Sequence, residues 1–265
     1  MLDQGHGAAP PRSAGPLADP VIESRRLVEG AATAGLTIRV LGGVAVRMQA
    51  PSDAPLPQRS IGDIDIATRQ GGWRALAEFL KSAGYAADDM FNALNGARRL
   101  LFFDHLNDRK LDVFVGEFDM CHSIPVTGRL EKSPMTVPLA ELLLTKLQIV
   151  QLTERDLRDI YSLTYHHNVS AGDGSGIEAD FIANLCAKDW GLWRTCTSTI
   201  QQSLARLPEY PMPADAARLV AERLKELSRV LEKAPKSARW KLRSRVGDKV
   251  RWYNEPEENL PTPTE

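Results

Sequence analysis

Two aspartates, Asp63 and Asp65, stand one residue apart in the stretch Ile61-Gly62-Asp63-Ile64-Asp65-Ile66. In an extended strand alternate side chains share a face, so we expect both carboxylates on one side of the strand. Neighbouring carboxylates repel each other, and aspartate has a poor strand propensity. A shared divalent cation removes that cost, since Mg²⁺ takes carboxylate oxygens together with substrate phosphates. The alternative is a strand end whose acidic face meets water.

A third aspartate, Asp112, lies in the apolar stretch Leu111-Asp112-Val113-Phe114-Val115. A carboxylate is costly to bury among apolar residues unless a charged group or a cation pairs with it. Together with Asp63 and Asp65 it completes a carboxylate set that can hold two cations and so clamp the attacking and leaving oxygens of a phosphoryl transfer. Taken alone, Asp112 is equally consistent with an edge strand that has one solvated face.

A glycine pair, Gly42 and Gly43, ends the apolar run that begins at Leu36. Without a Cβ, these residues let backbone N–H groups approach a polyphosphate at the start of a helix. A tight strand-to-helix turn accounts for the pair equally well. The sequence has no Gly-x-x-x-x-Gly-Lys-Ser/Thr and no Gly-x-Gly-x-x-Gly, so neither a P-loop nor a Rossmann site is predicted.

Hydrophobic periodicity predicts an α/β (α+β) fold, in which a small mixed sheet is followed by a helical domain. In the first part we expect helices over 21–34, 44–50 and 72–83, strands over 36–41 and 61–67, and a hairpin of 99–103 with 110–115. Beyond Pro138 only helices are expected, over 139–151, 154–165, 176–187, 189–207 and 214–233. The expected parts are a disordered tail (1–19), a core (20–135) and a helical domain (136–265).

Three segments of the first part resemble the DNA-polymerase-β-like nucleotidyltransferase superfamily: Leu41-Gly42-Gly43-Val44-Ala45, Arg59-Ser60-Ile61-Gly62-Asp63-Ile64-Asp65 and Leu111-Asp112-Val113. The resemblance implies a small mixed-sheet nucleotidyltransferase core, and two Mg²⁺ ions on Asp63, Asp65 and Asp112. It further implies that Gly42 and Gly43 bind the terminal phosphates. Arg59 resembles an arginine that often precedes the Asp-x-Asp pair, although serine and glycine replace the usual spacer.

Two helical segments, Leu143-Leu144-Thr145-Lys146-Leu147-Gln148 and Arg155-Asp156-Leu157-Arg158-Asp159-Ile160, are similar to motifs of the abortive-infection (AbiEii) and MenT toxin nucleotidyltransferases. The resemblance, which spans roughly residues 36–163 in all, implies that Lys146 and Asp156 belong to the site, with Lys146 and Arg59 neutralising the triphosphate of a bound NTP. Each charged residue also has a purely structural interpretation. Lys146 could extend to solvent, Thr153-x-x-Asp156 has the spacing of a capping box, and Asp159 could pair with Lys146 or Arg155 or be solvated.

The C-terminal stretch 233–251 has eight basic residues and one acid, Asp248. Trp240, Trp252 and Tyr253 are interleaved with or follow the basic residues and could stack on unpaired bases of RNA. The alternative is a solvated helix whose aromatic residues pack onto the domain. His166 and His167 are expected to compensate a helix dipole rather than to bind metal.

The overall composition limits the function classes. A net charge of -1 means that any attraction for nucleic acid must be local. Three widely spaced cysteines without a C-x-x-C motif are typical of reduced thiols in a cytoplasmic protein. No apolar run approaches the ~20 residues that span a membrane, so no membrane partner is expected.

The sequence thus predicts an enzyme that moves an NMP from an NTP to an acceptor hydroxyl and releases pyrophosphate. The toxin resemblance implies that the acceptor is RNA or tRNA and that an antitoxin protein is a second partner. A small-molecule nucleotidyltransferase of the aminoglycoside or lincosamide type is an alternative. A catalytically inactive nucleotide-binding module is another, which the three aspartates disfavour.

Overall fold

The computed structural model describes residues 15–50, 52–57, 59–170, 172 and 176–255 of the chain. Its fold is mixed α/β, as expected, and contains a five-stranded sheet with the strand order β1-β2-β5-β4-β3. In that order the strands are β1 (Ile38–Leu41), β2 (Ile64–Thr68), β5 (Arg109–Val115), β4 (Arg99–Asp104) and β3 (Ala86–Ala87). Strands β2 and β5 are parallel, whereas the other neighbouring pairs are antiparallel.

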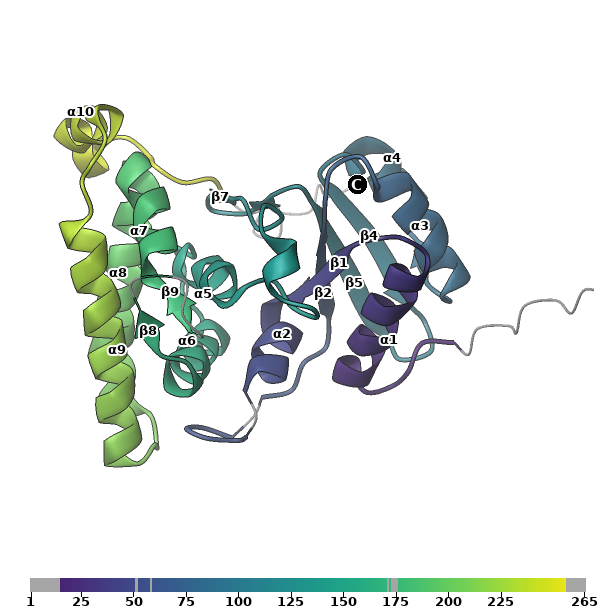
Figure 1. The fold of residues 1–265 in the computed structure, drawn as a ribbon, viewed down its shortest axis with the longest axis horizontal. Helices are drawn as coiled ribbons and strands as arrows, with labels where there is room; N and C mark the ends of the chain where they lie inside the picture. Colours follow the sequence, from purple (N-terminus) through teal and green to yellow (C-terminus); the bar gives the residue numbers. More distant parts are fainter. Residues whose placement is uncertain (1–14, 51, 58, 171, 173–175, 256–265) are drawn as a thin grey trace, which may run out of the picture.

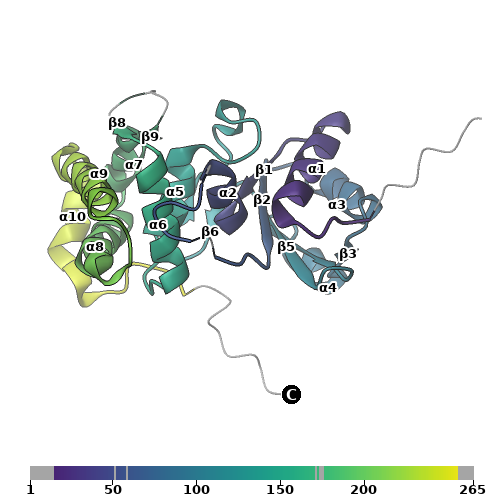
Figure 2. The same ribbon diagram turned by 90° about the horizontal axis from the view of Figure 1, so that it is seen from below.

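Helices cover both faces of this sheet (Figures 1 and 2). Helices α1 (Pro20–Thr33) and α3 (Trp73–Ser82) lie on one face, and α2 (Gly42–Gln49) lies on the other, toward the helical half of the chain. The short helix α4 (Asp89–Asn95) packs beside β4. The alternation in β2 explains this layering, because Ile64 and Ile66 are buried on one face while the half-buried Asp65 takes the opposite face.

The helical half consists of α5 (Leu139–Leu147), α6 (Glu154–His166), α7 (Ala179–Lys188), α8 (Trp190–Arg206), α9 (Ala214–Lys233) and α10 (Ala238–Val246). Short pairs of strands flank it, β6 (Phe118–Asp119) with β7 (Ser123–Ile124) and β8 (Val169–Ser170) with β9 (Ile177–Glu178). Single 3₁₀ turns occur at Leu130–Lys132, Leu207–Glu209 and Gly247–Lys249. Across the described part of the chain, no helix has the length and apolar character needed to cross a membrane.

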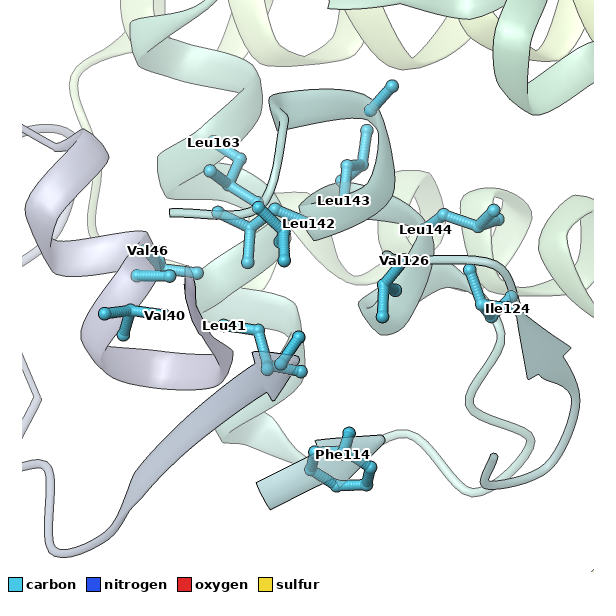
Figure 3. Close-up of a cluster of buried hydrophobic side chains, with 14 of the residues drawn as sticks. Val40, Leu41, Val46, Phe114, Ile124, Val126, Leu142, Leu143, Leu144 and Leu163 are labelled. Atoms are coloured by element: carbon cyan, nitrogen blue, oxygen red, sulfur yellow. The ribbon is translucent and has the colours of Figure 1, made fainter. Parts of the chain in front are cut away.

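The two halves share one hydrophobic core. The segment at the expected boundary pairs with β1, since Val40 N donates to Met135 O at 2.9 Å and Val137 N donates to Val40 O at 2.9 Å. Figure 3 shows Val40 and Val46 of the sheet side facing Leu142 and Leu163 of the helical side, and all four are buried. The helical half is therefore packed against the sheet by a continuous apolar contact.

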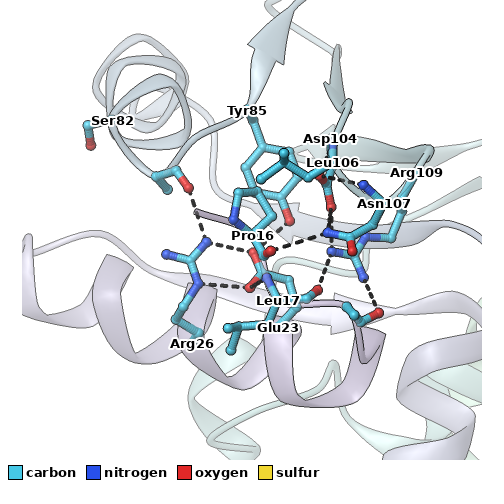
Figure 4. A network of polar contacts seen from close by, with 12 residues as sticks. Pro16, Leu17, Glu23, Arg26, Ser82, Tyr85, Asp104, Leu106, Asn107 and Arg109 are labelled. Carbon is cyan, nitrogen blue, oxygen red and sulfur yellow. Dashed lines mark hydrogen bonds and ion pairs between the residues drawn. The ribbon is translucent and has the colours of Figure 1, made fainter. Parts of the chain in front are cut away.

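The first described residues are bound to the core, although the expected disordered tail included them. Arg109, paired with Asp104 at 2.6 Å, also donates hydrogen bonds to Leu17 O at 2.7 Å and Ala18 O at 3.2 Å (Figure 4). A buried guanidinium needs several acceptors, and the backbone before α1 supplies two of them. The expected tail is thus wrong for residues 15–19, while residues 1–14 lie outside the described residues.

Candidate active site

The glycine pair makes room for two of the charged side chains. Gly42 has φ +66°, a conformation that side chains rarely adopt, and a Cβ there would collide with the carboxylate of Asp65. A Cβ on Gly43 would collide with the guanidinium of Arg59. Helix α2 begins at Gly42. The pair therefore forms the expected strand-to-helix turn and lets the chain pass directly beside Asp65 and Arg59.

Asp65 and Asp112 lie side by side on adjacent strands. They are register partners in the parallel pair β2–β5, so their side chains share a face of the sheet. Both line a cavity of about 350 Å³ together with Gly42, Lys146 and Asp156. The structure thus gathers five of the eight expected site residues around one cavity, with contributions from both halves of the chain.

Asp63 does not belong to the lining of this cavity. Strand β2 begins at Ile64, so Asp63 precedes the strand and is exposed. The expected strand over 61–67 therefore starts three residues too early. Residues 61–63 have no partner in the described strands, because β2 begins to pair with β5 at Ile64 and with β1 at Asp65. Two of the three expected metal ligands face the cavity together.

Asp112 is buried and is paired with two cations. Arg99 Nε lies 2.9 Å from Asp112 Oδ1, and Lys110 Nζ lies 2.8 Å from Asp112 Oδ2. Strand β5 is central, between β2 and β4, which excludes the alternative of a solvated edge strand. The two ion pairs supply the compensation that a buried carboxylate requires.

The donor set can be compared with what Mg²⁺ requires. Within the residues that the structure describes, no group of three or more His, Cys, Asp and Glu side chains could hold a metal ion by itself. Mg²⁺ is, however, usually bound by one or two carboxylates and completed by substrate phosphates and water. Asp65 and Asp112, on one face of the sheet and in one cavity, fit that requirement if phosphate oxygens supply the remaining ligands.

Lys146 is a largely buried cation facing the same cavity. Only 12% of its side chain is exposed, and its Nζ lies 2.9 Å from Asp159 Oδ2 and 3.2 Å from Asp156 Oδ1. Burial opposes its charge, but the carboxylates of Asp159 and Asp156 outweigh that effect and raise the pKa of Lys146. The alternative in which Lys146 extends into solvent is therefore wrong.

Asp156 caps helix α6 and also lines the cavity. Its Oδ2 accepts hydrogen bonds from Thr153 N at 3.2 Å and Thr153 Oγ1 at 2.7 Å, and its own N–H donates to Thr153 Oγ1 at 3.3 Å. This is the capping box expected from the Thr-x-x-Asp spacing, which begins α6. Asp156 Oδ1 remains directed to Lys146, so the cap fixes the carboxylate at the cavity wall.

Asp159 connects the two halves of the chain. Arg59 donates to both of its carboxylate oxygens, and Lys146 binds it from α5. Burial opposes ionisation, but the charge of Lys146 and the hydrogen bonds from Arg59 outweigh it and keep the pKa of Asp159 below its ordinary value. Arg59 and Gly43 line a smaller hollow of about 40 Å³ beside Asp159, not the main cavity.

Several lining residues were not expected from the sequence. The cavity also contains Arg99, Phe114, Phe118, Met120, Gln148, Gln151 and other side chains. Arg99 lies 5.3 Å from the ring centroid of Phe114 and binds Asp112. The hairpin register places Arg99 opposite Phe114, which shares a face of β5 with Asp112 because the two are two residues apart. The alternation of side chains along β4 and β5 was the sequence signal that could have placed Arg99 beside Asp112.

The two histidines at the end of α6 serve the structure. The ring of His166 makes a hydrogen bond to Ala54 O at 2.8 Å, and that of His167 makes one to Gln49 O at 2.9 Å. Burial lowers the pKa of His167. These contacts join the end of α2 and the segment that follows it to the helical half.

The aromatic residues of the C-terminal stretch pack onto α8, as expected if they stabilise the domain rather than stack on bases. Trp240 meets Trp193 edge-to-face at 5.1 Å, and Trp252 meets Trp190 at 5.9 Å. Arg243 lies 4.6 Å from the ring centroid of Trp190 and donates hydrogen bonds to Gly247 O and Val250 O. The basic residues that remain exposed on α10 are Arg239, Lys241 and Arg245.

Comparison with protein-family models, with curated proteins and with solved structures finds no match to this chain. The fold, a mixed sheet packed against helices, is compatible with many activities. The charged cavity is therefore a better guide to function than the fold.

Proposed function

We propose that this protein is a metal-dependent nucleotidyltransferase that moves an NMP from an NTP to an acceptor hydroxyl and releases pyrophosphate. One observation carries the proposal. Two carboxylates on adjacent parallel strands, Asp65 and Asp112, line one cavity with the largely buried cation Lys146. A cation site and a phosphate-binding charge on opposing elements are what the positioning and neutralisation of a polyphosphate require.

In this proposal Asp65 and Asp112 hold Mg²⁺, and Asp63, exposed just before β2, supplies a further ligand at the rim. Bound Mg²⁺ would neutralise the triphosphate and lower the pKa of the acceptor hydroxyl. The proposed site holds two Mg²⁺ ions, as the family resemblance implies.

The remaining charged residues bind or orient the phosphates. Gly42 lies at the first turn of α2, where backbone N–H groups and the helix dipole favour an anion. Lys146 places its positive charge at the cavity wall. Arg59 is bound to Asp159 and contacts Gly43, so its role is to hold Asp159 and, through it, Lys146 in position.

The proposed acceptor is RNA, such as the end of a tRNA, in a toxin-antitoxin setting with an antitoxin protein as partner. The exposed Arg239, Lys241 and Arg245 on α10 support it, because phosphate contacts of this kind supply sequence-independent affinity for RNA. A small hydroxylated molecule of the aminoglycoside class is the other acceptor to test.

A second candidate function is nucleotide binding without transfer. The observation that favours it is the double ion pair of Asp112 with Arg99 and Lys110, which neutralises this carboxylate without a metal. In a transferase these two cations must share Asp112 with Mg²⁺ or turn to the phosphates.

The test is incubation of the protein with each labelled NTP and Mg²⁺, with either total RNA or an aminoglycoside panel as acceptor. We expect label in RNA from the wild type, and a loss of at least a hundredfold (about 2.7 kcal/mol) in Asp65→Asn and Asp112→Asn. The matched control is Asp108→Asn, an exposed residue with φ 47° at the hairpin turn, where asparagine is well tolerated.

Asp63→Asn separates the two metal ligands of the Asp-x-Asp pair. Because Asp63 lies outside the cavity lining, we expect its substitution to reduce transfer less than that of Asp65. Transfer by Asp65→Asn near the wild-type rate would contradict the metal site. NTP binding without transfer to any acceptor would select the nucleotide-binding module. Growth arrest on expression of the wild type, but not of Asp65→Asn, would support the toxin setting.

A further inference from the structure

A second hollow lies on the side of α4, next to the cavity that Asp65, Asp112 and Lys146 line, here called the catalytic cavity. It has a volume of about 190 Å³ and shares Arg99, Phe114 and Met120 with the cavity. The residues that belong to this α4 hollow alone are Phe91, Asn95, Arg98, Asp119, Asn254 and Glu255. We infer that the α4 hollow is the acceptor subsite of the proposed transfer reaction and that it takes the unpaired terminal nucleotide of an RNA. This inference rests on the proposed function.

The strand order aligns four residues in a row across the sheet. Leu41 pairs with Asp65, Asp65 with Asp112, and Asp112 with Leu101, so these residues form a row across β1, β2, β5 and β4. Gly42, where the leaving pyrophosphate would bind, follows Leu41 at the β1 end of the row. At the usual strand spacing the row extends about 14 Å.

An in-line displacement places the attacking oxygen opposite the leaving oxygen. With the pyrophosphate at the β1 end and the metal ligands in the middle of the row, the acceptor has to approach from the β4 end. The α4 hollow opens at that end, since Arg99 of β4 and Phe91 and Asn95 of α4 line it. The two hollows meet at Arg99, which binds Asp112.

The lining of the α4 hollow fits a single nucleotide. Phe91 provides a half-buried aromatic ring, Asn95 and Asn254 provide amides, and Arg98 is exposed with no ion-pair partner among the described residues. Unpaired bases in RNA are bound by stacking on aromatic rings and by hydrogen bonds to their edges, and arginine binds the phosphate.

Charge argues against a polycationic small acceptor. Among the described residues that line the hollow there are two carboxylates, and Glu255 is paired with Arg251 at 2.8 Å. Of these two, Asp119 would face an aminoglycoside, against the positive charge of Arg98.

The end of the described chain connects the basic helix with this hollow. After α10 the chain returns to the core, where Asn254 N donates to Cys121 O at 3.0 Å, and Figure 1 shows this segment running from α10 toward β7. Trp252 holds the segment on α8 through its hydrogen bond to Thr195 Oγ1 at 3.1 Å. An RNA bound along Arg239 and Arg245 is thereby adjacent to a segment whose last described residues, Asn254 and Glu255, line the α4 hollow.

The test measures RNA binding without NTP. A short 5′-fluorescent single-stranded RNA with a free 3′ hydroxyl is titrated with the full chain, and its anisotropy is recorded. Loss of a stacking ring costs about tenfold in affinity, so we expect this loss in Phe91→Ala. We expect the same loss in Phe91→Leu, which keeps most of the apolar volume and replaces the alanine variant if that variant folds poorly. Arg98→Ala should weaken binding at least threefold.

The matched control is Arg74→Ala, an exposed arginine on α3 with the same change of charge, which should stay within twofold of the wild type. Since Phe91 and Arg98 do not line the catalytic cavity, NTP affinity should not change in any of these variants. An RNA hairpin whose 3′ end is paired should compete poorly for the wild type.

The outcomes separate this inference from the proposed function. Wild-type RNA affinity in both Phe91 variants and in Arg98→Ala overturns the inference, even if transfer to RNA is observed. Loss of RNA affinity in the variants of a protein that transfers no nucleotide supports the α4 hollow as a binding site for an RNA end but rejects the transferase, and with it the role of the hollow as an acceptor subsite. Unchanged RNA affinity together with a raised KM for an aminoglycoside in Phe91→Leu would also overturn the inference, because the hollow would then take a small acceptor.

Discussion

Arg59 and Asp159, a hundred residues apart, form a two-point ion pair between the core and the helical half. Arg59 Nε donates to Asp159 Oδ1 at 3.0 Å, and Arg59 Nη2 donates to Asp159 Oδ2 at 2.9 Å. Lys146 Nζ reaches the same Oδ2 at 2.9 Å. One carboxylate on α6 therefore joins the segment before β2 to the lysine of α5. This junction adds a charged link between the two halves to their apolar contact.

Removal of this carboxylate should cost more than removal of a typical surface charge. In Asp159→Asn the largely buried Arg59 loses its carboxylate partner and Lys146 keeps only Asp156. Uncompensated buried charge is costly, so we expect a loss of about 3 kcal/mol in the free energy of unfolding. Denaturant titration measures it. The control is Glu154→Gln on the same helix, whose exposed side chain pairs with Arg158 at 3.5 Å and should cost below about 0.5 kcal/mol. A loss under about 1 kcal/mol for Asp159→Asn would contradict the role given to this residue.

The contribution of Asp159 should disappear in acid. Its pKa is lowered in the folded state, because the charge of Lys146 and the bonds from Arg59 outweigh burial. A carboxyl with a lowered pKa stabilises the fold fully above its unfolded value, about 3.9, and this stabilisation is lost as the pH falls through the folded pKa. The difference in stability between the wild type and Asp159→Asn should thus be constant from about pH 5 to 8 and shrink below about pH 4. A difference that grows on acidification would refute this assignment.

The two glycines should differ in their response to a methyl group. Gly42→Ala adds a Cβ where Asp65 lies and forces a positive φ, so we expect a loss of about 2 kcal/mol and a displaced Asp65. Gly43→Ala meets a side-chain nitrogen of Arg59 but has no positive φ to maintain, so it should cost less. Gly62→Ala is the control, because no atom of the described residues lies within 4 Å of the added Cβ, and it should change the free energy of unfolding by less than about 0.5 kcal/mol. Equal losses for all three would contradict the steric argument.

The C-terminal stretch should divide into a structural and a binding part. Trp240→Ala removes the edge-to-face contact with Trp193 and should cost about 2 kcal/mol, less than the 3–5 of a fully buried tryptophan. Arg239→Glu with Arg245→Glu should leave stability within about 0.5 kcal/mol but weaken RNA binding, most strongly at low salt. Thermal unfolding and electrophoretic-shift titrations at two salt concentrations measure both. Undiminished RNA binding in the double variant would remove α10 from the RNA contact.

Local sequence patterns anticipated much of the architecture. Helix α9 has the expected bounds Ala214–Lys233, the hairpin of β4 and β5 occurs as expected, and the capping box of Thr153 with Asp156 begins α6. Helices and caps depend on residues three or four positions apart, so the sequence contains their causes directly. Short elements such as α4 and β3 were missed, because seven and two residues are too few to show a period.

The ion-pair partners of the charged residues could not be predicted from local sequence patterns. The sequence by itself determined which residue types stand close along the chain, including the carboxylates, the glycine pair and the lysine of α5. Only the tertiary structure decided that Asp65 faces the cavity while Asp63 does not, and that Arg59 binds Asp159. It also decided that the C-terminal segment returns to the core at Cys121. The physical reason is that exposure and ion pairing depend on strand register and on contacts between distant segments, which the packing of the whole chain selects.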